Sequence, residues 1–246
     1  MCVYMTEISV ATQRRILKDV RDILRHPLTD EGITYIHDED NMMKGYAMII
    51  GPPDSPYEHG FFMFDFTFPI DYPFNPPKVK FMTNDGTTRF HPNLYSNGKV
   101  CLSILNTWSG EQWASTQSIR SILMTIRSLF DWNALTMEPG FKLSHPEVKP
   151  YDDIVQIKTI ELAMFRIMNE FLPYPQPIWS SFIPIMKNYL KENRQQIDTY
   201  IASVEKKTIE KYEMVDGVLY QRVYKRNIPY SFSYIKKEWN AFNQNE

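Results

Sequence analysis

Apolar residues recur at helical spacing near the start of the chain. In the stretch TQRRILKDVRDILRHP, one helix face carries Ile16, Leu17, Val20, Ile23 and Leu24. This period indicates an amphipathic helix. Thr12 is the expected N-cap, because its hydroxyl can accept a hydrogen bond from the first helical turn. Pro27 disfavours helical geometry at His26 and is expected to end the helix there.

A two-residue period follows, which is typical of strands. In FFMFDFTFP, one face carries Phe62, Phe64, Phe66 and Phe68, and the other carries Met63, Asp65 and Thr67. This pattern predicts a strand with one face on a core. Three further candidate strands are ITYIHDE, GYAMIIG and KVKFMT. Their short, turn-rich connections favour an antiparallel meander over parallel βαβ units.

Turn-forming residues separate these strands from a second helix. The stretch FPIDYPFNPPK has four prolines between Pro69 and Pro77, so it is expected to be a stiff, extended surface loop. Irregular chain then runs from Asn84 to about Thr116, and segments of this length are often functional. Ser118 is the expected cap of a strong helix. Its apolar stripe consists of Ile119, Ile122, Leu123, Ile126, Leu129 and Phe130.

Beyond residue 150 the pattern is mainly helical. We expect helices at about 152–171 and 181–212, separated by LPYPQP. GVLYQRVYKR is a candidate strand and YSFSYIKKEWNAF a candidate final helix. The chain is therefore predicted to contain an α+β domain at residues 8–150 and a mainly helical C-terminal extension at 151–246.

Composition and charge narrow the functional classes. The chain is 43% hydrophobic and 14% aromatic, which argues against disorder. A formal net charge of -2 does not favour nucleic acid as the main partner. Two cysteines and five scattered histidines suggest neither a disulfide framework nor a metal site. Without an apolar run of ~20 residues or a secretory signal, we expect a protein of the cytosol or nucleus that binds no membrane.

Cys101 is the only cysteine away from the N-terminus, and it lies in HPNLYSNGKVCLSIL. A free cysteine is more often a small buried apolar residue than a reactive one. Here, however, it follows the turn signal SNG within the irregular stretch. One reactive alternative is a Cys–His hydrolase, in which His91 acts as the base for the thiol. No local hydrolase signature accompanies the pair.

The same segment resembles the active-site segment of ubiquitin-conjugating enzymes, which has His-Pro-Asn and then an acceptor cysteine eight residues after the Asn. RILKDVRDILRHP resembles the family's first helix, and the stretch from MIIGPPDSPYEHG to NPPKVKF resembles its sheet and proline-rich loop. WASTQSIRSILMTIRSLF is similar to the helix after the cysteine. TWSGEQW, EPGF and the long C-terminus resemble the larger subclass with extensions. The resemblance covers about residues 11–130 and implies the ubiquitin-conjugating fold.

The resemblance implies a role for three residues of the segment. Cys101 would accept the C-terminal carboxyl of ubiquitin, or of a ubiquitin-like modifier, as a thioester, and a substrate lysine would then attack it. Asn93 would stabilise the oxyanion with its amide or order the loop; one such donor is worth roughly 3–4 kcal/mol. His91 would brace the loop. This mechanism requires a sulfur open to solvent on a rigid shelf, with the amide nearby.

The resemblance also suggests candidate contact residues. Asp131, Asn133 and Glu138 could orient the attacking lysine, although surface turn residues are the simpler interpretation. Contacts with the activating enzyme would involve Arg14, Arg15 and Lys18, and ligase contacts would involve Phe74 and Trp113. Two departures from the family pattern are Ala114-Ser115, where Ser-Pro is usual, and Ser103, where smaller members often have an acid.

The implied enzyme is an acyltransferase that needs no metal or bound cofactor, because the upstream activating enzyme uses the ATP. A member of the same fold that only binds ubiquitin is the alternative from a different functional class. The presence of both Cys101 and Asn93 favours the enzyme.

Overall fold

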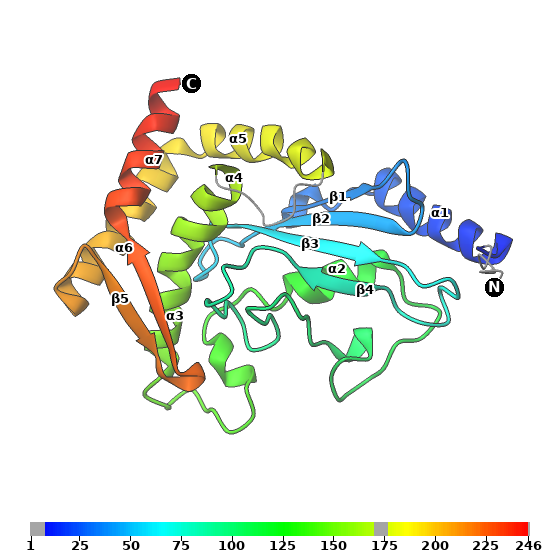
Figure 1. Ribbon diagram of the computed structural model, residues 1–246, viewed down its shortest axis with the longest axis horizontal. Helices are drawn as coiled ribbons and strands as arrows, with labels where there is room; N and C mark the ends of the chain where they lie inside the picture. Colours follow the sequence, from blue (N-terminus) through cyan, green and yellow to red (C-terminus); the bar gives the residue numbers. More distant parts are fainter. Residues whose placement is uncertain (1–7, 170–176, 246) are drawn as a thin grey trace, which may run out of the picture.

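A computed structural model describes residues 8–169 and 177–245 of the chain. Its main sheet has four antiparallel strands in the order β1-β2-β3-β4, as Figure 1 shows. Their bounds are Ile33–His37 (β1), Lys44–Ile50 (β2), Phe61–Thr67 (β3) and Lys78–Phe81 (β4). The register places Met48 opposite Met63 and Phe64 opposite Phe81. The predicted meander is therefore confirmed, strand by strand.

Helix α1 (Val10–Arg25) begins earlier than predicted, and Thr12 is not its N-cap. The Ser9 hydroxyl accepts a hydrogen bond from the Thr12 amide at 3.1 Å and caps the helix instead. The Thr12 hydroxyl donates to the Ile70 carbonyl at 2.9 Å, which ties α1 to the proline-rich loop. The predicted stop before Pro27 is confirmed.

Only part of the predicted apolar face of α1 is buried. Ile16 and Ile23 lie in the core, whereas Leu17 and Leu24 are 38% and 68% exposed. The helix therefore turns one edge of its apolar stripe toward solvent.

The helix after the cysteine matches its prediction closely. Helix α2 (Ile119–Arg127) has a capping box between Ser118 and Ser121, and all six residues of its predicted stripe are buried. The first part of the chain also contains three short 3-10 turns among the described residues: η1 (Thr29–Glu31), η2 (Ser103–Leu105) and η3 (Ala134–Met137).

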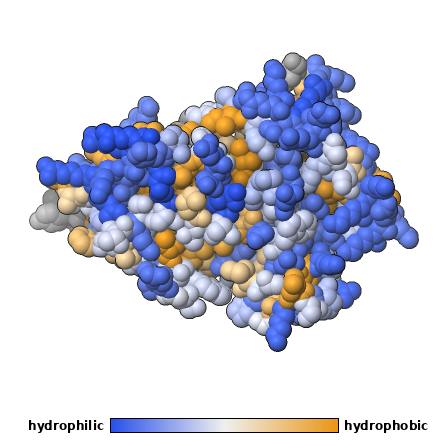
Figure 2. Space-filling view, turned by 180° about the vertical axis from the view of Figure 1, so that it is seen from behind, coloured by the Kyte–Doolittle hydropathy of each residue, from blue (hydrophilic) through white to orange (hydrophobic). Residues whose placement is uncertain are grey.

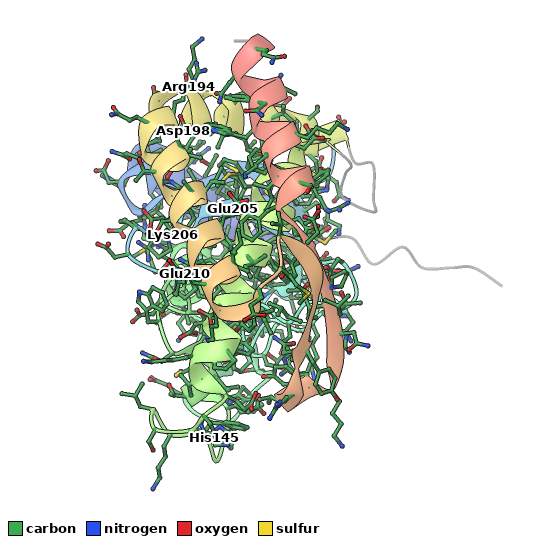
Figure 3. The ribbon with its side chains drawn as sticks, turned by 90° about the vertical axis from the view of Figure 1, so that its left-hand side faces the viewer. His145, Arg194, Asp198, Glu205, Lys206 and Glu210 are labelled. Carbon is green, nitrogen blue, oxygen red and sulfur yellow. The ribbon has the colours of Figure 1, made fainter. Side chains whose placement is uncertain are left out.

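The extension contains a β-hairpin as well as helices (Figures 1 and 3). Its helical elements are α3 (Val148–Lys158), the π-helical η4 (Thr159–Arg166), α4 (Ile167–Asn169), η5 (Pro177–Phe182), α5 (Ile183–Glu192), α6 (Arg194–Tyr212) and α7 (Phe232–Asn245). The hairpin comprises β5 (Asp216–Gln221), the turn η6 (Arg222–Tyr224) and β6 (Arg226–Ser231). The domain boundary predicted after residue 150 falls in the first turn of α3.

Two predictions for the extension are corrected. The helix predicted at 181–212 is divided at Asn193, whose φ of -105° and ψ of 15° depart from helical values and whose side-chain and backbone amides both donate to the Tyr189 carbonyl. The single strand predicted at 217–226 is a hairpin that turns at η6, with Lys225 left-handed. The end of the helix predicted at 152–171, and most of LPYPQP, lie outside the described residues.

Both faces of the sheet are covered, not one as predicted. Phe62, Phe64 and Phe66 pack in a core cluster with α2. Met63, from the other face of β3, packs in an extension cluster with Leu190 and other residues of the extension. The alternation in β3 therefore separates two apolar clusters.

The outer part of the extension is held together by contacts between α6 and α7, which lie side by side in Figure 3. The Trp239 indole donates to Asp198, and the Lys236 ammonium lies 2.7 Å from the Glu205 carboxylate.

From behind, hydrophobic surface runs across the middle of the molecule between hydrophilic ends (Figure 2). Among the described residues, no helix combines the length and apolar character needed to cross a bilayer.

Candidate active site

Cys101 lies at the end of a tight hairpin-like loop. The Tyr95 amide donates to the Lys99 carbonyl, and the Gly98 amide donates back to the Tyr95 carbonyl, both at 2.9 Å. Gly98 has a left-handed φ of 89°, and a Cβ at this position would lie 2.8 Å from the Phe81 carbonyl oxygen. The turn predicted from SNG therefore has a physical basis, since glycine avoids both costs.

Asn93 and Cys101 are joined by two hydrogen bonds. The Cys101 amide donates to the Asn93 carbonyl at 2.9 Å, and the Asn93 side-chain amide donates to the Cys101 carbonyl at 2.6 Å. Asn93 is buried. In this conformation the side chain orders the loop through one of its two N–H groups.

His91 braces the same loop. Its Nδ1 accepts a hydrogen bond from the Asn93 backbone amide at 3.0 Å, which leaves the ring proton on Nε2. Burial lowers the pKa of His91 to about 3, so the ring is neutral at physiological pH. A neutral ring whose Nδ1 is already occupied fits a structural role better than that of a base for the thiol.

The expectation of an exposed sulfur is wrong for this conformation, because Cys101 is only 1% exposed. Its neighbours Val100 and Leu102 both belong to the core cluster. The Thr107 hydroxyl accepts from the Leu102 amide and donates to the Val100 carbonyl, both at 2.9 Å. These contacts draw the segment against the core, so the thiol must move before it can react with another protein.

Comparisons with known proteins identify the family. The ubiquitin-conjugating enzyme family model matches residues 15–139, just over half of the chain. The chain belongs to the ubiquitin-conjugating enzyme family. Human ubiquitin-conjugating enzyme E2 Z is 45% identical over 167 residues, which is 67% of this chain and 47% of that protein. The Danio rerio protein of the same name is 37% identical over 213 residues, covering 85% and 58% of the two chains.

A third relative is much longer than this chain. The human dual E2 ubiquitin-conjugating enzyme/E3 ubiquitin-protein ligase BIRC6 is 34% identical over 220 residues, which is 82% of this chain and 4% of that protein. The chain thus spans about half the length of the E2 Z relatives. The matches over 82% and 85% of the chain extend beyond the part that the family model covers.

The structure separates the residues suggested for contacts with this family's activating enzymes. Arg14 and Lys18 are exposed on α1. Arg15 instead lies 3.0 Å from the Asp19 carboxylate and donates to the Ser115 carbonyl. The contact with Ser115 joins α1 to the chain before α2. Asp19 can pair with Arg15 because it lies one helical turn away on the same face of α1. Arg15 is therefore committed to internal contacts.

The two aromatic residues suggested for ligase contacts also differ. Phe74 is 76% exposed on the proline-rich loop. Trp113 is half-buried, and its indole donates to the Pro73 carbonyl at 2.7 Å. Phe74 has the exposure expected of an interface anchor, whereas Trp113 also helps to fix the loop on which Phe74 lies.

The three residues suggested for orienting lysine do not form one cluster of contacts. Asp131 is exposed and accepts from the adjacent Trp132 amide at 2.7 Å. The Asn133 backbone amide donates to the Asp152 carboxylate of α3 at 3.1 Å. Glu138 lies 3.8 Å from the Arg89 guanidinium. Their role in orienting lysine stays a prediction.

Sequence reasoning missed the residues that hold the approach to His91. The Tyr57 hydroxyl donates to the Phe90 carbonyl at 2.7 Å, and the Tyr151 hydroxyl donates to the Arg89 carbonyl at 2.8 Å. Both tyrosines are almost wholly buried, so in the sequence they resemble ordinary core aromatics. Within the described residues, no group of three or more His, Cys, Asp or Glu is placed to hold a metal ion.

Proposed function

We propose that the chain is a ubiquitin-conjugating transferase that carries ubiquitin, or a ubiquitin-like modifier, as a thioester on Cys101. The double hydrogen bond between Asn93 and Cys101 carries the proposal, because it places a side-chain amide beside the residue that would react. Family membership supports the same assignment. The partners would be a modifier, an activating enzyme, protein substrates and, for some substrates, a ligase.

The proposed reaction consists of two acyl transfers. First, the Cys101 sulfur attacks the thioester carbonyl of the modifier on the activating enzyme; a new C–S bond forms, the old one breaks, and the departing thiol receives the proton. A substrate lysine amine then forms an amide bond with the same carbonyl, and the Cys101 thiol is restored. Neither step needs a metal or organic cofactor on this chain. ATP is consumed upstream, when the activating enzyme is loaded, and we place the reaction in the cytosol or nucleus.

Each step requires a change from the present conformation. The buried Cys101 thiol has to become accessible. The Asn93 amide donates one of its two N–H groups to the Cys101 carbonyl, and it has to direct an N–H at the oxyanion if it is to stabilise the charge. Donors aimed at a developing oxyanion lower barriers by roughly 3–4 kcal/mol each. We therefore assign Asn93 a loop-ordering role before the reaction and an oxyanion-stabilising role during transfer.

The second candidate is a protein of the same fold that binds ubiquitin without catalysis. The burial of Cys101 is the observation that favours it. A Cys–His hydrolase is less well supported, because burial depresses the His91 pKa and its Nδ1 is occupied. Release of a carboxyl-linked leaving group without ATP, lost in His91→Asn, would support the hydrolase instead.

A charging assay distinguishes the first two functions. The protein is incubated with ATP and a panel of activating enzymes and their modifiers. The transferase should form an adduct that a thiol reductant removes, and Cys101→Ser should form a more stable oxyester. Binding of modifier without an adduct from any activating enzyme would overturn the transferase proposal.

A further inference from the structure

The extension holds the chain that leads into the active-site loop. Residues 85–90 form neither helix nor strand, and their backbone carbonyls accept hydrogen bonds from distant side chains. The Arg226 guanidinium of β6 donates to the Gly86 carbonyl at 2.8 Å. The Tyr151 hydroxyl of α3 donates to the Arg89 carbonyl, also at 2.8 Å. The course of this segment therefore depends on the extension.

The Arg89 guanidinium is held between two aromatic rings. Its central carbon lies 3.7 Å from the ring centroid of Tyr95, in the Cys101 loop, and 4.2 Å from that of Tyr224, in the hairpin turn. The guanidinium also donates to the Pro92 carbonyl. The Tyr224 hydroxyl donates to the Glu138 carboxylate at 3.0 Å, and this carboxylate lies 3.8 Å from Arg89.

The hairpin turn packs differently from the strands that lead to it. Leu219 of β5 and Ile228 of β6 belong to the extension cluster. Val223 and Tyr224, in the turn, pack against the core cluster around α2. The turn therefore brings an aromatic side chain of the extension to the approach to the active-site loop, about 130 residues away in sequence from Arg89 and Tyr95.

We propose that Tyr224 is a positioning residue for the transfer reaction: its ring holds the Arg89 guanidinium, which fixes the Pro92 carbonyl at the start of the loop that carries Asn93 and Cys101. This inference rests on the proposed transferase function. A free arginine side chain samples many rotamers, whereas a planar guanidinium stacked between rings keeps one orientation. The hydrogen bond to Pro92 then keeps its direction.

Thiol accessibility tests the positioning without any modifier. In a Cys2→Ser background Cys101 is the only thiol, and its alkylation by iodoacetamide is measured by mass spectrometry. A cation–π contact shifts a local equilibrium by about fivefold, so Tyr224→Ala should raise the alkylation rate about fivefold. Tyr224→Phe keeps the ring and should stay closer to wild type. Tyr220→Ala is the matched control, since Tyr220 is 52% exposed on the same hairpin.

Transfer is then measured separately from charging. With the Cys101 thioester formed beforehand, Tyr224→Ala should slow discharge to free lysine about fivefold, in line with the same contact, with the KM for the activating enzyme unchanged. Arg89→Lys keeps the charge but loses the stacked plane, so it should behave alike, and the double variant should add little. A merely structural contact would lower the melting temperature and leave discharge unchanged well below that temperature.

The outcomes separate the two proposals. Absence of a thioester in the wild-type protein contradicts the proposed function, whereas alkylation still reports on the loop. Equal alkylation and discharge in Tyr224→Ala and Tyr220→Ala would overturn the role of Tyr224. If Tyr224→Ala does not fold, Arg89→Lys and Tyr224→Phe provide the same comparison, and wild-type behaviour of both contradicts it.

Discussion

Asn93 connects both ends of the active-site loop. Its backbone contacts His91 and Cys101, and its side chain contacts the Cys101 carbonyl. The amide group is buried, so its removal leaves the Cys101 carbonyl without this partner. A lost hydrogen bond of this kind costs about 1–2 kcal/mol of folding free energy. Loss of stability and loss of catalysis can therefore be measured as separate effects.

We predict that Asn93→Ala charges Cys101 at nearly the wild-type rate but discharges to lysine 10²- to 10³-fold more slowly, roughly the effect of removing an oxyanion donor. Single-turnover charging and discharge, followed on gels, measure the two rates. Asn97→Ala is the control, because Asn97 is exposed in the same loop and accepts from the Lys99 amide at 3.1 Å. Equal losses in charging and discharge would indicate a misfolded loop instead.

Asp152 is a buried carboxyl with an unusual pKa. The Asn133 backbone amide donates to its Oδ2, and Oδ1 has no hydrogen-bond partner within the described part of the chain. Burial, and to a lesser extent the charge of Asp153, raise the pKa to about 6. Since this exceeds the unfolded value near 3.8, its stabilising contribution is complete below about pH 4 and is lost as the pH rises through 6.

We predict that Asp152→Asn raises the free energy of unfolding at pH 8 by about 1–2 kcal/mol, because a neutral amide avoids burying the charge. The gain should vanish near pH 4. Urea unfolding at several pH values measures it. Asp153→Asn is the control and should lower stability at pH 8, because Asp153 lies 3.4 Å from the Lys207 ammonium. A gain for Asp152→Asn that does not depend on pH would contradict the explanation.

At the scale of elements, His59 lies where the β2–β3 connection meets α5 and α6. Its Nδ1 lies 2.8 Å from the Tyr189 hydroxyl, its Nε2 lies 3.5 Å from the Glu58 carboxylate, and its ring packs edge-on against Tyr200. Burial lowers the pKa of His59 to about 4. Because this is below the unfolded value, His59 contributes stability above about pH 6.5 that is lost as the pH falls toward 4.

We predict that wild-type protein loses on the order of 2 kcal/mol more stability than His59→Asn between pH 7 and 4, because the variant has no ring to protonate. Asparagine tolerates the left-handed φ of 64° at this position. The same titration of unfolding free energy measures the difference. Parallel pH profiles for the two proteins would show that protonation of His59 does not cause the loss of stability.

The elements were predictable where the signal is local. In β3, Phe62 and Phe64 on one face alternate with Met63 on the other. Ser118 caps a helix whose apolar stripe is continuous. Likewise, the Asn93–Cys101 pair lies within one short motif. The strand and the helix cap are set by neighbours within a few turns of chain, so periodicity and turn chemistry suffice to predict them, whereas the Asn93–Cys101 pair is expected only from the resemblance to ubiquitin-conjugating enzymes.

Three of the errors concern contacts between distant segments, whereas the cap of α1 at Ser9 and the break at Asn193 are local. Alternation in β3 shows that Met63 lies opposite Phe62 and Phe64 but not that the extension covers it. The buried state of Cys101 depends on packing of both its neighbours, and the commitment of Arg15 depends on a loop a hundred residues away. No local pattern contains this information.

At the scale of the whole molecule, the sheet is shared by two apolar clusters. Phe62 of β3 packs with α2, and Met63 beside it packs with the extension. Removal of either layer would leave one face of the sheet exposed to water, at a cost of about 25 cal/mol per Å² of apolar surface. The domain and the extension are therefore expected to unfold together, and damage far from the sheet should destabilise β2 and β3.

We predict that Leu190→Ala, in α5, lowers the stability of the whole chain by about 2–5 kcal/mol, because it leaves a cavity in the extension cluster. Leu190 is fully buried, whereas Ile185 in the same helix is 36% exposed, so Ile185→Ala is the matched control with little effect. Amide hydrogen exchange measures the result, and protection should fall in β2, β3 and α2 as much as in α5. Loss confined to the extension would show that the sheet keeps its fold without this cover.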